Sequence, residues 1–238
     1  MERFSYELEK LRGTLVRPVV LFFVVSLALL VMGTPTFATQ IFLSAKSFLV
    51  PSNVPLVALG PVSVFMAPIV ISFLISLLIT FPYLLYSLGS YLRPALRPKE
   101  RAAMYTFVIP SLILFYLGCA FGYFLLIPAT FSILYSFAAP IGVTPFFSLD
   151  SFISSVFLLT VSVGFMFLLP MLMALLAKFS IMPYERWLKN WRGMLVIALI
   201  FSAVVTPDGS GITMVFLFVP LVLLYGVGLA VCKKMAAI

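Results

Sequence analysis

The 238-residue chain is too apolar for a soluble protein. Hydrophobic residues make up 63% of it and charged residues only 9%, so a soluble fold could not cover its apolar surface with a charged exterior. Several long runs contain no charge at all. Because about 20 apolar residues cross a bilayer as a helix, each run corresponds to one span, to one span with a loop, or to a short span. The composition therefore excludes a soluble globular fold and predicts an all-α polytopic membrane protein.

Six spans account for the chain. We expect a cytoplasmic amphipathic segment at residues 1–17, a transmembrane domain at 18–231 and a cytoplasmic tail at 232–238. The predicted spans are residues 18–38, 62–88, 102–131, 151–177, 193–207 and 212–231.

Local composition predicts further features of these segments. Residues 39–61 are rich in turn-forming residues and predict an ordered loop outside the membrane. Pro110 and Pro128 predict a kinked third span. The polar segment 90–101 holds two prolines and predicts a connecting loop. The last two spans are expected to be short, which leaves a hydrophobic mismatch with the bilayer.

The basic residues indicate how the spans are oriented. The N-terminal segment and the loops after the second and fourth spans each hold four Lys or Arg, and the C-terminal tail holds two. The alternate loops hold only Lys46. The positive-inside rule therefore places both termini in the cytoplasm. The net charge of +8 is explained by these short clusters, so membrane lipid rather than nucleic acid is the expected contact.

The residues needed for catalysis are not evident. The chain has no His, and its two cysteines, Cys119 and Cys232, lie in different apolar segments. There is no Walker A motif, no metal-ligand cluster and no nucleophile paired with a base, so we expect neither an enzyme nor a cofactor. The topology alone would also fit a transporter or channel. Such proteins ordinarily carry intramembrane charges, whereas the predicted spans contain none.

Several local motifs narrow these alternatives. They occur in one order along the chain: Leu11-Arg12 with Leu15, Tyr91-Leu-Arg-Pro-Ala-Leu-Arg-Pro-Lys-Glu-Arg101, Leu114–Phe124 with Pro128, Gly164–Pro170, and Thr206-Pro-Asp208 with Pro220. Each motif is weak alone, but the ordered set covers about residues 7–230. The chain thereby resembles the TatC component of the twin-arginine protein translocase.

Some positions depart from the family's usual pattern. Lys10 stands where the family usually has Glu, and Leu168 replaces an intramembrane Glu of the fourth span. Ile212 replaces a Gln, and Gly226 a frequent Glu. The chain is therefore identified as a divergent member. The binding site is expected to depend on the cytoplasmic loop rather than on the membrane interior.

The resemblance implies a function and a set of partners. It implies a receptor that binds the twin-arginine signal peptides of folded cargo. The receptor would work in an oligomeric complex at the plasma or inner membrane, and the proton-motive force would drive transport. Single-span TatA/TatB-type proteins are expected at the last hairpin. A scaffold that has kept the fold and lost signal binding is the alternative within the family.

The resemblance also implies which residues form the sites. Glu100 would bind the two signal arginines, because a carboxylate pairs bidentately with guanidinium groups. The other residues expected at this signal-peptide site are Tyr91, Pro94, Arg101, Glu9, Glu7 and Arg12. The residues expected at the partner-helix hairpin are Thr206, Pro207 and Asp208. Glu100 could instead be a solvated residue that balances neighbouring cations, and Asp208 an ordinary turn residue.

Overall fold

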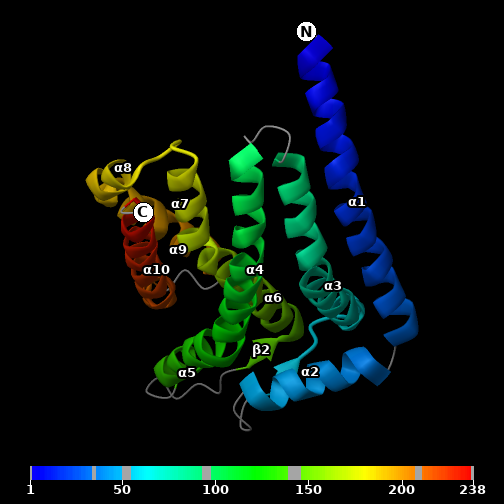
Figure 1. The fold of residues 1–238 in the computed structure, drawn as a ribbon. Helices are drawn as coiled ribbons and strands as arrows, with labels where there is room; N and C mark the ends of the chain where they lie inside the picture. The colour runs from blue at the N-terminus through cyan, green and yellow to red at the C-terminus, as the bar shows by residue number, and fades with distance from the viewer. Residues whose placement is uncertain are drawn as a thin grey trace.

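The computed structural model describes residues 2–33, 36–49, 55–92, 98–138, 146–206 and 211–236. Nearly all of them are helical (Figure 1). The helices are α1 (Glu2–Gly33), α2 (Thr36–Leu49), α3 (Pro61–Leu92), α4 (Pro98–Phe121), α5 (Ile127–Ala138), α6 (Leu149–Phe167), α7 (Leu169–Lys178), α8 (Tyr184–Lys189), α9 (Trp191–Val205) and α10 (Ile212–Ala236). A π-helix, η2 (Gly122–Leu126), joins α4 to α5, and two short strands are β1 (Leu56–Val57) and β2 (Phe147–Ser148).

Four stretches within the described residues are long and apolar enough to cross a membrane. They are Pro61–Tyr91, Phe107–Leu134, Leu149–Lys178 and Ile212–Lys234. Two shorter apolar helices, Val16–Val31 and Trp191–Val205, lie where the first and fifth spans were predicted. The helical class is therefore confirmed with four candidate spans, while the count of six and the orientation stay predictions.

The N-terminal segment is not separate from the first apolar helix. We expected a boundary near residue 17, but α1 runs unbroken from Glu2 to Gly33 with Pro18 inside it. A proline removes one backbone hydrogen bond and usually bends or ends a helix. Here the α-helix continues on both sides of Pro18. α1 ends at Gly33, before the predicted end of the span at residue 38.

The prediction of a loop at residues 39–61 was wrong for its first half. Residues 36–49 form helix α2, which lies across the ends of the longer helices (Figure 1). Ala45 and Leu49, four residues apart, are buried among the side chains of α2 that the structure describes. The turn-forming residues that motivated the prediction all follow residue 50, and they do not affect the helix before them.

Polar contacts join the ends of α3 and α6 near α2. Strands β1 and β2 pair in parallel, with Leu56 opposite Phe147 and Val57 opposite Ser148. Ser63 in α3 donates a hydrogen bond to the carboxylate of Asp150 in the first turn of α6. Ser148 caps α6 by accepting a 3.2 Å hydrogen bond from the Ser151 N–H. These contacts fix the two helix N-termini beside each other.

The predicted fourth span, 151–177, is bent rather than straight. It consists of α6 and α7, which meet at Leu168. Pro170 follows two residues later and has no N–H to continue the helical hydrogen bonds, which explains a break at this place. Leu168 itself donates a 3.1 Å hydrogen bond to the Phe165 carbonyl, which tightens the last turn of α6.

The predicted kink of the third span is a π-helical turn. In η2 the N–H of Ile127 donates to the Gly122 carbonyl, and Pro128 comes directly after. Such a turn accommodates an irregularity without breaking the helix. Pro110, by contrast, lies within the continuous α4.

Only one of the last two helices is short. α9 has 15 residues, as the short uncharged run predicted. The prediction of a short final helix was wrong, because α10 has 25 residues and continues through Lys233 and Lys234.

Glycines allow α4 and α6 to pack closely. A Cβ added to Gly164 would lie 2.5 Å from Cys119 Sγ, and one added to Gly118 would lie 2.7 Å from the Phe167 Cβ. A Cβ added to Gly122, at the start of η2, would lie 3.2 Å from the Val163 Cβ and 3.4 Å from the Thr160 Cα, which is tight but less so. Helices in membranes associate through such small residues, because lipid supplies no hydrophobic driving force between them.

The α1–α3 contact also depends on small residues. Ser72, Ser76 and Thr80 are buried at intervals of four on one face of α3. The Ser76 hydroxyl donates a 2.6 Å hydrogen bond to the Phe22 carbonyl of α1. This stripe of small polar residues lets α1 lie close along α3, where Figure 1 shows the two helices side by side.

The close glycine contact predicts a sharp mutational contrast. Gly164→Ala should lower the free energy of unfolding by about 1–3 kcal/mol, because overpacking forces Cys119 and Phe115 to move. Gly226→Ala is the matched control, since nothing lies within 4 Å of a Cβ at Gly226. Thermal unfolding midpoints in detergent measure both changes. Equal midpoints for the two variants would contradict this account of the α4–α6 contact.

Candidate functional site

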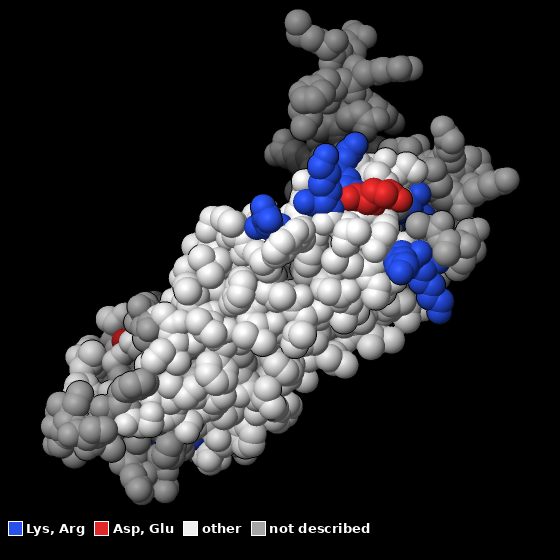
Figure 2. All heavy atoms as spheres, turned by 90° about the vertical axis from the view of Figure 1, so that its left-hand side faces the viewer, with Lys and Arg blue, Asp and Glu red and all other residues white. Residues whose placement is uncertain are grey.

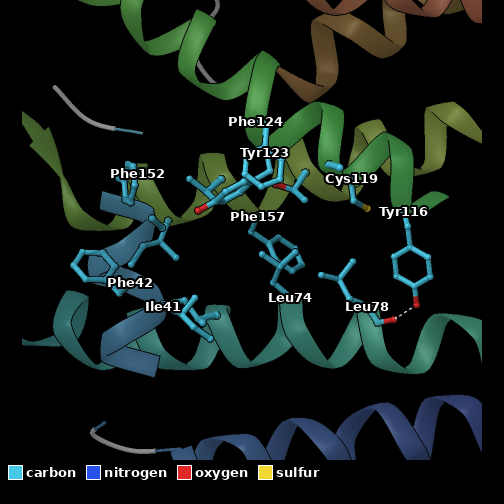
Figure 3. A pocket seen from close by; sticks show the side chains of 16 residues that line it. Ile41, Phe42, Leu74, Leu78, Tyr116, Cys119, Tyr123, Phe124, Phe152 and Phe157 are labelled. Carbon is cyan, nitrogen blue, oxygen red and sulfur yellow. Dashed lines mark hydrogen bonds between the residues drawn. The ribbon is translucent and has the colours of Figure 1, made fainter. Parts of the chain in front are cut away.

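A cavity of about 330 Å³ lies between α2, α3, α6 and the α4–η2 segment. Figure 3 shows Ile41 and Phe42 on one side, Leu74 and Leu78 below, and Phe157 near its centre. None of the described residues that line it is Asp, Glu, Lys or Arg. An apolar wall of this kind suits a hydrophobic side chain or hydrocarbon and offers no partner for a charge.

Few polar groups line the cavity. The Tyr116 hydroxyl is already engaged, since it donates a 2.7 Å hydrogen bond to the Leu78 carbonyl and links α4 to α3 (Figure 3). Cys119 is a buried free thiol. The Thr160 hydroxyl is buried without a partner among the described residues. The described lining of the cavity therefore offers a ligand few hydrogen-bonding groups.

Leu168 belongs to an apolar cluster at the α6–α7 break. It packs against the buried Phe81, Phe115 and Cys119. The rings of Phe81 and Phe115 stack with centroids 3.4 Å apart and planes 14° apart. At the position where the resemblance predicts a carboxylate, the structure therefore places a leucine among aromatic rings. An ionised group could not replace it here without a partner.

The predicted connecting loop at residues 90–101 is partly helical. α3 continues to Leu92 and α4 begins at Pro98, so Glu100 and Arg101 lie in the first turns of a helix. The loop was predicted because prolines usually interrupt helices. Pro98 instead occupies the first helical position, where a backbone N–H would have no helical partner, so its absence does not destabilise the helix. An acidic residue in the first turn is also favourable to the helix dipole.

The end of α3 and the start of α4, which flank this connection, lie close together. Tyr91 is half-buried in the last turn of α3, and the neighbouring ends of α3 and α4 lie side by side (Figure 1). Pro94 lies outside the described residues. The side chains of Glu100 and Arg101 are not described, so their contacts stay a prediction.

The N-terminal candidates are placed by their backbone. Glu7, Glu9 and Arg12 lie in the first third of α1, as does Lys10. Figure 1 shows this part of α1 projecting at the same end of the molecule as the α3–α4 connection. Because both elements lie at this end, the position of α1 is compatible with the predicted contribution of Glu7 and Glu9 to the site. The structure does not describe the side chains of these two residues.

Thr206 has an evident structural role. Its Oγ1 donates hydrogen bonds of 3.0 Å and 3.3 Å to the carbonyls of Ser202 and Ala203, and its side chain is buried. The Ser202 carbonyl also accepts a 3.1 Å hydrogen bond from the Thr206 N–H, so the hydroxyl adds to the last helical bond of α9. The Ala203 carbonyl can receive no helical bond from residue 207, because that residue is a proline. Pro207 and Asp208 lie outside the described residues, so the partner-hairpin prediction stays open for them.

Charges gather at one end of the molecule. Figure 2 shows most of the visible Lys and Arg side chains there, with a wide uncharged belt beside them. The segment from Lys178 to Arg192 supplies four of these cations, as the charge count predicted. This separation is typical of a protein whose belt contacts lipid.

The cavity is the feature that sequence reasoning missed. Tyr116, Cys119, Ala120 and Tyr123 line it from a single helical face, with spacings of three, one and three residues. That spacing was a usable signal within the motif Leu114–Phe124. It could not reveal the opposite walls, because α2 was not predicted.

The role of Thr206 can be tested with two substitutions. Thr206→Val keeps the shape and removes the hydroxyl, so it should cost about 1 kcal/mol of stability. Thr206→Ser retains the donor and should cost less. Urea or thermal unfolding in detergent measures both. If the serine variant were the less stable of the two, the hydrogen bonds to Ser202 and Ala203 would not explain the role of Thr206.

Comparisons with known proteins agree with this architecture. The family model described as Sec-independent protein translocase protein (TatC) matches residues 7–220. The Sec-independent protein translocase protein TatC of Cenarchaeum symbiosum is 33% identical over 197 residues, which cover 83% of this chain and 75% of that protein. The TatC protein of Aquifex aeolicus is 30% identical over 200 residues, which cover 83% and 82%.

A solved structure also matches over nearly the whole chain. The crystal structure of the twin-arginine translocase receptor TatC superposes with a TM-score of 0.84 at 28% sequence identity. The match covers 96% of this chain and 98% of the solved one.

Proposed function

Because the chain belongs to the TatC family of Sec-independent protein translocase proteins, we propose that it is the twin-arginine signal-peptide receptor of a translocase that exports folded proteins. The observation that carries this proposal is the likeness to the solved twin-arginine translocase receptor over 96% of the chain. The family model matches residues 7–220, a range that contains the α3–α4 connection and α9.

The two signal arginines would bind at the start of α4. Glu100 would accept their guanidinium groups, since charge-assisted bidentate pairs of this kind are strong and geometrically specific. Arg101 and the neighbouring cations weaken the attraction, so Glu7 and Glu9 would contribute negative charge from α1. Tyr91 and Pro94 would shape the surface, and a tyrosine face attracts a cation.

The apolar region of the signal would continue into the bundle. The cavity between α2, α3, α4 and α6 is lined by hydrocarbon and aromatic rings, which suit the apolar part of a signal and not its arginines. Recognition would thus be divided between a charged surface and an apolar interior. The role is binding rather than catalysis, with transport energy supplied by the proton-motive force.

Single-span TatA/TatB-type partners would bind at α9. Val196, Ile200 and Val204 form one stripe of this helix and are 57%, 57% and 77% exposed. A 15-residue helix is shorter than a typical span, so a neighbouring helix would relieve the mismatch with lipid. The assembly would be oligomeric and lie in the plasma or inner membrane with both termini in the cytoplasm.

One observation favours a second function within the same family. Leu168 occupies an apolar cluster at the position of an expected carboxylate, which is compatible with a scaffold that no longer binds signals. A transporter or channel receives no comparable support, because the cavity residues that the structure describes include no charged side chain to bind a solute.

Signal binding can be tested at Glu100. Glu100→Gln should weaken photocrosslinking of a twin-arginine signal peptide about tenfold, the loss expected when one charge-assisted contact is removed. A lysine-lysine signal should crosslink weakly to the unaltered protein. The readout is crosslinked peptide at subsaturating concentration in membranes.

Glu185→Gln is the matched control for this experiment. Glu185 is an exposed glutamate of α8, so the substitution removes the same charge at another place. It should leave the crosslink within about twofold of its original strength, as an exposed charge contributes little by itself. A crosslink that survives Glu100→Gln and the lysine-lysine change would contradict the site, and no specific crosslink at all would favour the scaffold.

Partner binding can be tested on α9. A photoreactive residue at Ile200 should crosslink to a single-span partner, because Ile200 is exposed on the proposed docking stripe. Leu27 of α1 is the control position, since it is 61% exposed and lies on a different helix. Equal crosslinking at the two positions would show general proximity in the membrane and refute a specific site on α9.

A further inference from the structure

A group of cations surrounds the short helix α8 and the end of α10. We name this group the basic patch; it consists of Lys178, Arg186, Lys189, Arg192, Lys233 and Lys234. Three apolar stretches reach it: Leu149–Lys178 and Ile212–Lys234 end there, and Trp191–Val205 begins there. The patch therefore lies at the level where these helices leave the hydrocarbon, which is where lipid phosphates lie.

The patch has a rigid support. Trp187 of α8 is buried in a cluster with Met173, Tyr225 and Cys232. The Tyr225 hydroxyl donates a 2.6 Å hydrogen bond to the Trp187 carbonyl. Because Cys232 directly precedes Lys233, this cluster fixes the end of α10 beside α8. The cations are thus presented from a packed surface rather than from a tail.

The charge of the patch is poorly balanced. Among the side chains that the structure describes, Glu185 is the one carboxylate on these elements. The other described carboxylate, Asp150, is bonded to Ser63 at the opposite end of α6. Six cations beside one described carboxylate attract anions, and Figure 2 shows mostly basic side chains among the described charges at this end of the molecule.

Large apolar side chains are exposed among these cations. Ile181 is 60%, Leu188 49% and Trp191 47% exposed. The guanidinium carbon of Arg192 lies 5.5 Å from the centre of the Trp191 ring. Exposed leucine and tryptophan beside arginine and lysine are typical of a segment that lies in the headgroup region of a membrane. Protein interfaces also contain such residues, but the position of the patch at the ends of three apolar stretches favours lipid.

We propose that the basic patch is a binding site for anionic phospholipid headgroups. Arg186 and Arg192 would pair with phosphate oxygens through their planar guanidinium groups, and the lysines would add charge. Trp191 and Leu188 would lie among the first carbons of the acyl chains. This site is independent of the signal-peptide receptor function.

Native mass spectrometry of the purified full chain can test this site. Phosphatidylglycerol should be retained about tenfold better than phosphatidylcholine by the unaltered protein. The Lys189→Gln/Arg192→Gln variant should lose most of this preference. The charge-conserving variant Lys189→Arg/Arg192→Lys should keep it, which separates lost charge from failed folding.

The matched control removes one arginine and one lysine elsewhere. Arg17→Gln/Lys46→Gln carries the same change of charge outside the patch and should keep the preference for phosphatidylglycerol within about twofold. Equal losses in the two double variants, or no loss in either, would overturn the proposal. Displacement of the lipid by millimolar inorganic phosphate would also overturn it, because it would indicate a site for the free ion.

Discussion

The close approach of α4 and α6 is the contact on which the rest of the bundle depends. A Cβ at Gly118 would clash with the Phe167 side chain, and one at Gly164 would clash with Cys119 Sγ. Phe115 and Phe167 fill the space on either side of this contact. Once α4 and α6 are fixed, the same two helices supply most of one side of the cavity. Alanine at Gly118 or Gly164 would force these side chains or the helices to shift.

This packing divides the protein into regions of different chemistry. The interior beside α4 and α6 is apolar, from the cavity to the Phe81–Phe115 stack that Leu168 contacts. Charge is found at the helix ends, mainly at one end of the molecule. A ligand with a charged part and an apolar part would meet both regions in turn, and a signal peptide with paired arginines ahead of an apolar stretch has this form. In the proposed receptor the surface charges would provide specificity, because Leu168 stands where the resemblance implies a carboxylate.

The sequence predicted the long helices well because their uncharged runs are longer than any soluble core would tolerate. It also predicted the short α9 from its run of apolar residues. Helix α2 was missed because a loop was predicted for the whole of residues 39–61 from turn-forming residues that all follow residue 50. The spacing of Ala45 and Leu49, which lie on one helical face, was the available signal for a helix. The helical position of Glu100 was missed because a proline can begin a helix as well as end one. The cavity depends on contacts between distant segments, which no local pattern contains.

Transport itself tests the central claim most directly. Membrane vesicles that contain this chain as their TatC protein, together with its single-span partners, would be given a folded fluorescent reporter that carries a twin-arginine signal. We expect protected, fluorescent reporter inside the vesicles when a proton-motive force is present, and about tenfold less when the signal carries two lysines. Import that is indifferent to the lysine change, or that persists after the proton-motive force is dissipated, would contradict the receptor function proposed for this protein.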